Sequence, residues 1–155
     1  MARRCGLSAQ FLALAGKRTA TAPLTIGHRV VGVSLLLTGE VADGRAHLDR
    51  AIALYNPVEH RPLTTRLSQE AGVAILSLRS LAMWLLGYPD AAKTDVERAL
   101  SDAREIGHAA TLLFALVMTA ITQMLIRDNS AVRIQGQEAV ALADEKGHCS
   151  GGRPE

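Results

Sequence analysis

Adjacent glutamate, histidine and cysteine side chains are the residues of this chain that could do acid/base or metal chemistry. Glu59 and His60 form such a pair in a segment bounded by prolines. Adjacent residues on a loop rarely converge on one substrate, and no third orienting group or nucleophile accompanies them. His148 and Cys149 could give zinc two ligands, but no neighbouring residue supplies the remaining two. We therefore predict no catalytic residue and no metal site.

A second candidate chemistry is phosphate binding, which the run Gly16-Lys17-Arg18-Thr19 partly matches. A P-loop needs a glycine five residues before its Gly-Lys pair and a serine or threonine directly after the lysine. With that spacing, backbone amides and a hydroxyl reach the phosphates and magnesium. Phe11 and Arg18 occupy those two positions, so the motif fails and we predict no cofactor.

The composition indicates a helical protein of one domain. In 155 residues, 48% are apolar, mainly Ala and Leu, and only 3% are aromatic. The net charge of +2 is spread along the chain rather than gathered into a basic face, so we expect no nucleic-acid partner. Cys5 and Cys149 lie near opposite ends without ligand spacing, which favours a reduced, cytoplasmic location.

Two apolar stretches and the N-terminus bear on membrane insertion. The run from Leu112 to Ile126 is shorter than the roughly 20 residues that cross a bilayer, so we predict a buried helix there. Arg79 lies at the centre of the other stretch, where lipid would tolerate it poorly. Ser8 and Gln10 interrupt the short apolar run near the N-terminus, which favours a helix over a secretory signal. We expect no membrane span.

Three stretches of the chain are versions of one another, which predicts a helical repeat protein. Ala51, Ala99 and Ala139 occupy equivalent positions, 48 and 40 residues apart. The pairs Gly107-His108 and Gly147-His148 are also 40 residues apart, so their place in the repeat explains these histidines without a metal. Repeats of this kind present extended binding surfaces, and we therefore expect binding rather than catalysis.

Each unit is predicted to contain a long apolar helix, a turn, and an amphipathic helix whose apolar residues recur at i, i+3, i+4 and i+7. The predicted helices are a lead-in helix at 7–18 and then pairs at 24–38 with 42–55, 66–86 with 89–105, and 109–126 with 130–146. Two prolines exclude a continuous helix over 56–62 and predict a loop there. We expect one helical-repeat domain over 1–148, with units at about 24–56, 66–107 and 109–147, and a disordered tail at 149–155.

Turn glycines at Gly39 and Gly87, together with Ala92, stand at characteristic positions of these units. The second helices add the pairs Ala51-Ile52, Ala99-Leu100 and Ala139-Val140. With these features the units resemble tetratricopeptide repeats, although periods of 40 and 48 residues exceed the usual 34. His28 and Leu76 stand where an early aromatic residue is expected. The resemblance implies an all-α fold, a right-handed α-solenoid of tetratricopeptide-like antiparallel helix pairs.

A further resemblance is carried by the runs from His28 to Tyr55, from Leu81 to Ala92 and from Ala103 to Leu116. They are similar to the C-terminal repeat region of large bacterial adenylate/guanylate cyclase–AAA ATPase fusion proteins, which act in signalling. The resemblance covers about residues 8–147 and implies a regulatory or partner-binding segment. Cyclase and ATPase domains are missing, and CSGGRPE replaces the next repeat. We therefore expect a fragment or shortened relative of such a protein.

If the units stack as tetratricopeptide repeats do, their first helices line a concave groove. The residues expected to face it, counted from the turns, are Arg29, Val33, Leu36, Ser77, Leu81, Trp84, Val117, Ile121 and Met124. These side chains could form a slot for a peptide or an amphipathic helix. They could equally pack against one another or against further repeats.

The expected function is that of a non-enzymatic protein–protein interaction or regulatory repeat module whose partner is a protein or peptide. One alternative is a retained nucleotide-dependent signalling role of the adenylate cyclase type. Another is a self-associating structural piece, in which uncapped repeat ends pair with a second copy.

Overall fold

A computed structural model describes residues 21–60 and 69–150 of the chain, and all regular structure within these residues is helical. The predicted all-α class is confirmed. The helices are α2 (Thr21–Thr38), α3 (Val41–Leu54), α4 (Pro57–His60), α6 (Ala71–Leu85), α7 (Pro89–Ile106), α8 (Ala109–Ile126) and α9 (Asn129–Ser150). The predicted lead-in helix at 7–18, the Gly16–Thr19 run and residues 151–155 lie outside the described residues.

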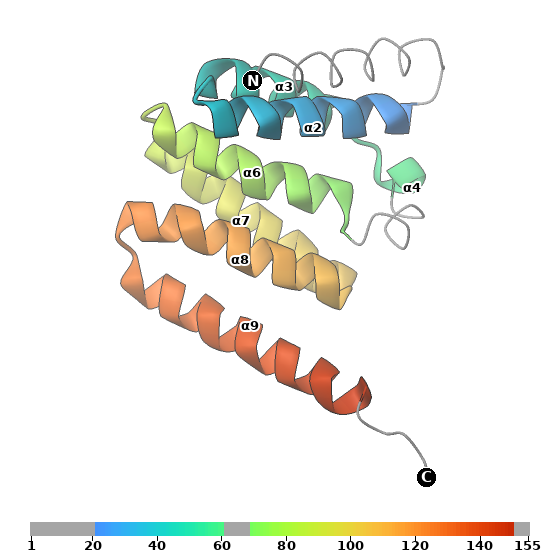
Figure 1. Cartoon of the computed structure of the whole chain (residues 1–155), viewed down its shortest axis with the longest axis vertical. Helices are drawn as coiled ribbons and strands as arrows, with labels where there is room; N and C mark the ends of the chain where they lie inside the picture. Colours follow the sequence, from blue (N-terminus) through green and yellow to red (C-terminus); the bar gives the residue numbers. More distant parts are fainter. Residues whose placement is uncertain (1–20, 61–68, 151–155) are drawn as a thin grey trace.

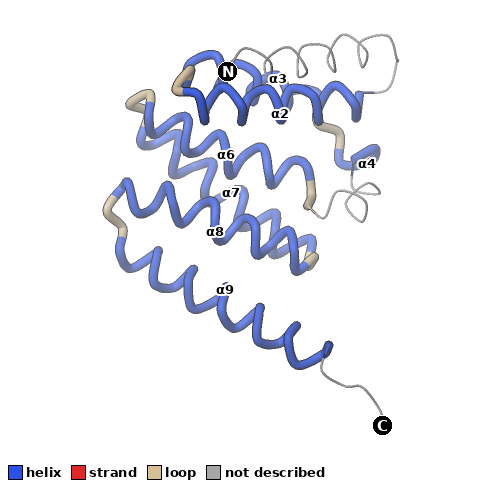
Figure 2. Tube along the Cα trace, viewed as in Figure 1, coloured by secondary structure: helices blue, strands red, loops and turns tan. Residues whose placement is uncertain are grey.

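The long helices pack as hairpins, α2 with α3, α6 with α7, and α8 with α9. Figure 1 shows the hairpins side by side in chain order, with α2, α6 and α8 forming one layer and α3 and α7 lying behind it. The trace in Figure 2 shows the short turns that join the two helices of each hairpin. The second helix of one hairpin contacts the first helix of the next, as α3 does with α6 and α7 with α8.

The hairpin turns end on residues in left-handed backbone conformation. Gly39 has φ of 91° and Gly87 has φ of 84°, which glycine adopts without steric cost. The third turn has Arg127 at φ 64°, a conformation that L residues with a side chain adopt at a cost. The turn signals in the sequence therefore correspond to real helix ends.

Two glycines let α2 and α3 approach closely. A Cβ atom on Gly44 would lie 2.9 Å from the carbonyl oxygen of Gly32, and one on Gly32 would lie 2.9 Å from Cγ of Leu48. Neither position has room for a side chain, so the first hairpin packs backbone against backbone.

The helix α6 is the centre of the core. Residues 71–77 are all buried, and side chains of α6 belong to both apolar clusters. One cluster joins the first hairpin to α6 and contains Leu48, Ala51 and Ile75. The other joins α6 to α7 and α8 and contains Val73, Val96, Leu100, Ala103, Ala115 and Leu116.

Three predicted boundaries were wrong. The helix predicted from residue 66 begins at Ala71, because the side chain of Glu70 caps it by accepting a hydrogen bond from the backbone N–H of Val73. The predicted loop over 56–62 contains the short helix α4, since proline is tolerated in the first turn of a helix. Helix α9 continues to Ser150, so residues 149–150 are helical rather than part of a disordered tail.

Candidate partner-binding groove

Helix α8 exposes its most apolar face. It is 18 residues long with a mean hydropathy of 2.0, yet only 28% of it is buried. Its exposed large apolar side chains are those of Leu113, Val117, Ile121, Met124 and Leu125. The prediction of a buried helix was therefore wrong. By length and composition α8 is also the one helix of the described residues that could cross a membrane, and the absence of a membrane span remains a prediction.

The buried face of α8 carries hydroxyl groups. Thr111, Thr119 and Thr122 are fully buried there, and each hydroxyl has a partner. The hydroxyl of Thr119 donates to the backbone oxygen of Ala115, at 2.7 Å, and that of Thr122 lies 3.0 Å from the hydroxyl of Ser80 on α6. Satisfied threonines can be buried at little cost, so these contacts allow this face of α8 to be buried together with Ala115 and Leu116 while its other apolar face is exposed.

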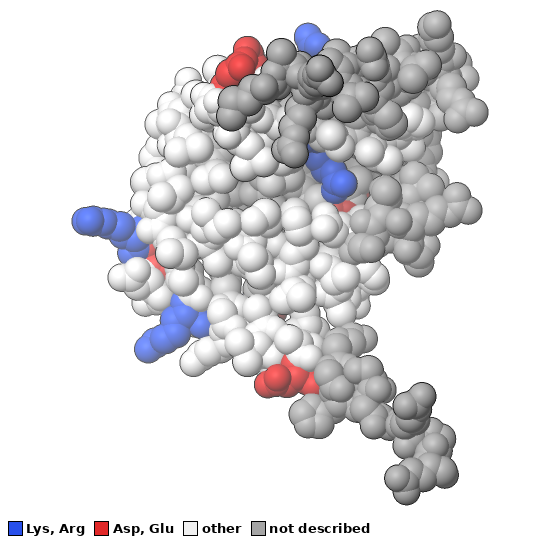
Figure 3. Space-filling view, in the orientation of Figure 1, with Lys and Arg blue, Asp and Glu red and all other residues white. Residues whose placement is uncertain are grey.

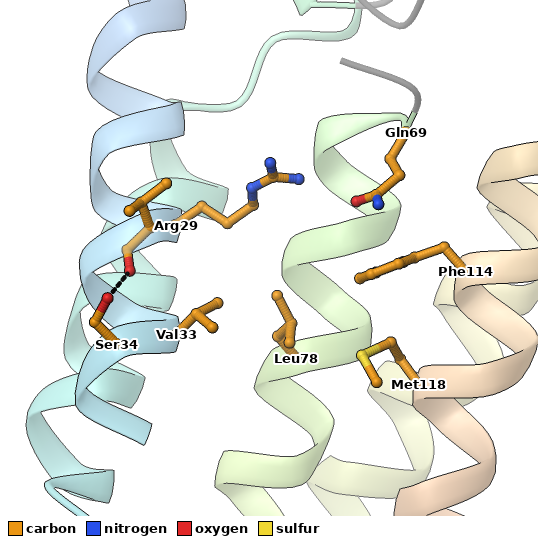
Figure 4. A pocket seen from close by; sticks show the side chains of 8 residues that line it. Arg29, Val33, Ser34, Gln69, Leu78, Phe114 and Met118 are labelled. Atoms are coloured by element: carbon orange, nitrogen blue, oxygen red, sulfur yellow. Dashed lines mark hydrogen bonds between the residues drawn. The ribbon is translucent and has the colours of Figure 1, made fainter. Parts of the chain in front are cut away.

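A cavity of about 360 Å³ lies between α2, α6 and α8. Figure 4 shows side chains from all three helices converging on it. Its wall is mostly apolar, and three of the lining side chains are polar. The lining residues are Val30, Val33, Leu78, Phe114 and Met118, with Arg29, Ser34 and Gln69 as the polar ones. We call the exposed apolar face of α8 and this cavity together the groove.

Arg29 is the cation of this cavity. Figure 4 shows its side chain extending from α2 toward Gln69, above the apolar wall. Burial lowers the pKa of its guanidinium from the usual value, and the negative charge of Glu70 opposes that change. Within residues 21–60 and 69–150, no hydrogen bond or ion pair holds this guanidinium. Figure 3 shows the same face of the molecule as mainly uncharged, with charged side chains chiefly toward its edge.

The structure brings part of the predicted groove set together. Arg29 and Val33 line the cavity, and Val117, Ile121 and Met124 lie on the exposed face of α8. These five predicted residues therefore lie in both parts of the groove, the cavity and the exposed face of α8.

Other members of that set lie elsewhere. Ser77 is 1% exposed and donates to the backbone oxygen of Val73, so its predicted place in the groove was wrong. Leu36 packs against the cluster around Leu48, toward α3 rather than toward the groove. Leu81 and Trp84 are half-buried on α6 and do not line the cavity.

Sequence reasoning missed several lining residues. Phe114 and Met118 are spaced i, i+4, which places them on one face of α8, but that helix is apolar almost all round and no face stands out. The spacing of residues from the hairpin turn predicted Val117 and Ile121, rather than Phe114 and Met118, as groove residues. Gln69 precedes α6 and has no sequence signal for a place in the groove.

Arg79, the other arginine in an apolar segment, is fully engaged within the fold. Its Nε and Nη2 atoms donate to the two carboxylate oxygens of Asp95, at 2.8 and 2.7 Å, and its Nη1 donates to Asp49 at 3.1 Å. These hydrogen bonds, chiefly those with Asp95, raise the pKa of the guanidinium. Arg79 therefore connects α3, α6 and α7 and is not available to a ligand.

Glu70 forms a second buried polar connection. Its side chain is 1% exposed, accepts a hydrogen bond from the Tyr55 hydroxyl at 2.5 Å, and also caps α6. Its backbone N–H donates to the hydroxyl of Thr111 at 3.0 Å. The carboxylate and the backbone N–H of Glu70 thus link the three hairpins.

His28 and His47 form a pair between α2 and α3 that the sequence analysis did not predict. Their Nδ1 atoms are 3.0 Å apart, so one ring donates a hydrogen bond to the other. Burial, followed by the positive charges of His47 and Arg50, lowers the pKa of His28. Burial and Arg50 also lower the pKa of His47, against the opposing charge of Asp43.

Acidification is expected to destabilise the protein through this pair. Because the folded-state pKa values of both histidines lie below the usual histidine value of 6.5, the unfolded chain binds protons more readily. The stabilisation is complete above about pH 6.5 and is lost as the pH falls through the folded pKa values. Two protonated rings also lose their shared hydrogen bond, which contributes about 0.5–1.5 kcal/mol.

Urea unfolding at pH 7.5 and pH 5.0 checks this expectation. The double variant His28→Gln/His47→Gln should lose less stability between the two pH values than the original chain does. The other histidines and the carboxylates are common to both proteins and cancel in the comparison. An equal loss in both would show that the pair does not carry the pH dependence.

The remaining candidates for chemistry receive no support from the geometry. Among the described residues, no group of three or more His, Cys, Asp or Glu side chains is placed to hold a metal ion. The side chains of Glu59, His60, His148 and Cys149 lie outside the described part of the chain. No protein-family model, curated protein or solved structure matches the chain.

Proposed function

We propose that this protein is a non-enzymatic helical-repeat module that binds a protein or peptide partner in the groove. The observation that carries the proposal is the orientation of α8, which buries threonines and exposes an apolar face that includes Val117 and Ile121. An exposed, contiguous apolar face on a soluble fold is typical of an interaction site. The cavity beside it offers a place for an anchoring side chain.

The same proposal includes the repeat family. Antiparallel hairpins packed in chain order, with the first helices forming one layer, support a solenoid of helix pairs. The resemblance to tetratricopeptide repeats implies that this solenoid is right-handed. The runs from His28 to Tyr55 and from Ala103 to Leu116 support a relationship to the C-terminal repeats of cyclase–ATPase signalling proteins. In this proposal the chain is cytoplasmic and supplies a regulatory contact.

Peptide selection tests the binding role. Dodecapeptides from a random displayed library are selected on the purified full chain, and the dissociation constants of the enriched peptides are measured by fluorescence anisotropy. Ile121→Glu places a charge in the groove and should weaken binding at least about tenfold, because a desolvated charge without a partner is costly.

Val140→Glu is the matched control, since Val140 is 62% exposed and lies on α9 outside the groove. It should leave the dissociation constants unchanged. If no peptide is enriched, or if Ile121→Glu binds as tightly as the original chain, the groove is not a peptide-binding site.

Self-association is a second candidate, favoured by exposed apolar residues on α9 in addition to those on α8. Ile134 is 58% exposed and Val140 is 62% exposed. A second copy could cover both helices. Light scattering during gel filtration separates the two candidates, because a monomer would have a mass of 16.5 kDa.

A further inference from the structure

We infer that the partner of this groove carries an acidic residue next to its apolar anchor, and that Arg29 binds the carboxylate. The inference rests on the proposed function and adds the chemistry of the partner. The cavity joins one cation to an apolar wall formed by Val33, Leu78, Phe114 and Met118.

The guanidinium of Arg29 is partly buried and makes no hydrogen bond with the described residues. It has lost part of its hydration, which is why burial lowers its pKa, and no described residue replaces the lost water by a hydrogen bond. A guanidinium presents up to five donors, and a carboxylate matches its geometry. A ligand carboxylate would therefore satisfy donors that the fold leaves open.

The neighbouring polar groups are already engaged. Glu70 attracts Arg29 from a distance, but its two oxygens accept hydrogen bonds from the Tyr55 hydroxyl and the Val73 N–H. The Ser34 hydroxyl donates to the backbone oxygen of Val30 at 2.9 Å. Gln69 remains beside Arg29 at the rim, where Figure 4 shows the two side chains facing one another, and its amide can add a donor to the same carboxylate.

The apolar wall defines the other half of the ligand. A cavity of about 360 Å³ is at the small end of the range for ligand pockets, about 300–1,000 Å³. That size suits one large apolar side chain rather than a whole folded element. Beyond the cavity, the exposed face of α8 continues past Val117 to Met124, which extends the apolar surface for neighbouring residues of the partner.

Charge complementarity with Arg29 favours a polypeptide that carries an acidic residue as the occupant of the cavity. Arg29 is the one cation among the described residues that line the cavity, so an acidic residue of a partner has a defined group to pair with there. A second copy of the chain remains an outcome of the test, because the same apolar face could pair with itself.

A double-mutant cycle between the protein and a selected peptide tests the inference. The peptides are those enriched from the random dodecapeptide library on the full chain. We expect them to share an acidic residue close to a large apolar residue. Replacing that acidic residue by its amide should weaken binding to the original chain by about tenfold to a hundredfold, the usual effect of losing a charge-assisted hydrogen bond.

The same peptide change should have little effect on the dissociation constant of the Arg29→Gln variant, because the guanidinium that binds the acidic side chain of the peptide is already absent. Arg133→Gln on the outer face of α9 is the control, since it removes an exposed arginine outside the groove. It should preserve the full effect of the peptide change. Far-ultraviolet circular dichroism checks that both variants keep their helices.

Each other outcome overturns a defined part of the argument. Enriched peptides that are apolar without an acidic preference, and whose binding is lost in Ile121→Glu but kept in Arg29→Gln, overturn this inference and leave the proposed function standing. Failure to enrich any peptide overturns both. A dimer that Met118→Glu dissociates places a second copy in the cavity and overturns the inference in favour of self-association.

Discussion

Replacing Arg79 by methionine is expected to lower the free energy of unfolding by about 3–5 kcal/mol, because it leaves a buried carboxylate without its partner. Asp95 is 4% exposed, and both of its carboxylate oxygens accept hydrogen bonds from Arg79. Asp49 also loses a partner, although it keeps its contact with Arg45. For a domain whose total stability is typically about 5–15 kcal/mol, this loss is large.

Urea unfolding measures the effect, followed by circular dichroism at 222 nm and by the fluorescence of Trp84, the single tryptophan. Arg104→Met is the matched control. It breaks the ion pair between Arg104 and Glu138, whose side chains are 49% and 32% exposed, respectively. Because this pair is exposed, its loss should lower the free energy of unfolding by no more than about 1 kcal/mol. The double variant Arg79→Met/Asp95→Leu should recover most of the loss, since both charges are then removed.

A small loss in Arg79→Met, comparable to that of the control, would contradict the role given to this ion pair. It would mean that water reaches Asp95 once the arginine is gone. The ion pair would then contribute as little to stability as an exposed one, although Arg79 lies between α3, α6 and α7.

Replacing Glu70 by alanine is expected to lower the free energy of unfolding by about 2–4 kcal/mol. The change removes the N-cap of α6 and leaves the buried Val73 N–H without its acceptor. It also removes the acceptor of the Tyr55 hydroxyl. Because α6 contributes to both apolar clusters, fraying at its first turn disturbs the centre of the core.

The exposed cap of α9 provides the control for this variant. Asp128 accepts a hydrogen bond from the N–H of Ala131 at 3.0 Å and has no comparable buried partner in the described residues. Asp128→Ala should therefore cost only about 1 kcal/mol, the usual contribution of a cap. The difference between the two variants, measured by urea unfolding, isolates the contribution of the contacts beyond the cap. Equal losses would show that the contact with Tyr55 contributes nothing.

The two stability variants also bear on the groove. Arg79 and Glu70 hold α6 in place between its neighbours, and the cavity lies between α2, α6 and α8. A variant that changes peptide binding only through loss of structure would change circular dichroism as well. Arg29 has no described structural partner, so Arg29→Gln can separate binding from folding.

The sequence by itself determined the all-helical class and most helix bounds, because these depend on local properties. Turn residues such as Gly39 and Gly87 end helices through their own backbone conformation. Apolar spacing in α7 places Val96, Ala99, Leu100 and Ala103 on one face, and all four are buried. Because the opposite face of α7 is polar, the buried face of this helix can be predicted from the sequence.

Only the tertiary structure decided which face of α8 is buried. The helix is apolar almost all round, so its own sequence favours no side strongly. The face that is buried carries Ala115 and Leu116, which join the core cluster, and threonines that find distant hydrogen-bond partners. Thr122 meets Ser80 and Thr111 meets Glu70, which are 42 and 41 residues apart in the chain.

The polar contacts and the cavity also depend on residues that are distant in the sequence and that only the tertiary structure brings together. Arg79 meets Asp49 from 30 residues away and Asp95 from 16 residues away, and His28 meets His47 across the first hairpin. Periodicity places a residue on a face of its own helix but does not specify which residue of another helix it meets. That depends on how closely the helices approach, as at Gly32 and Gly44, and on the summed packing of all the hairpins.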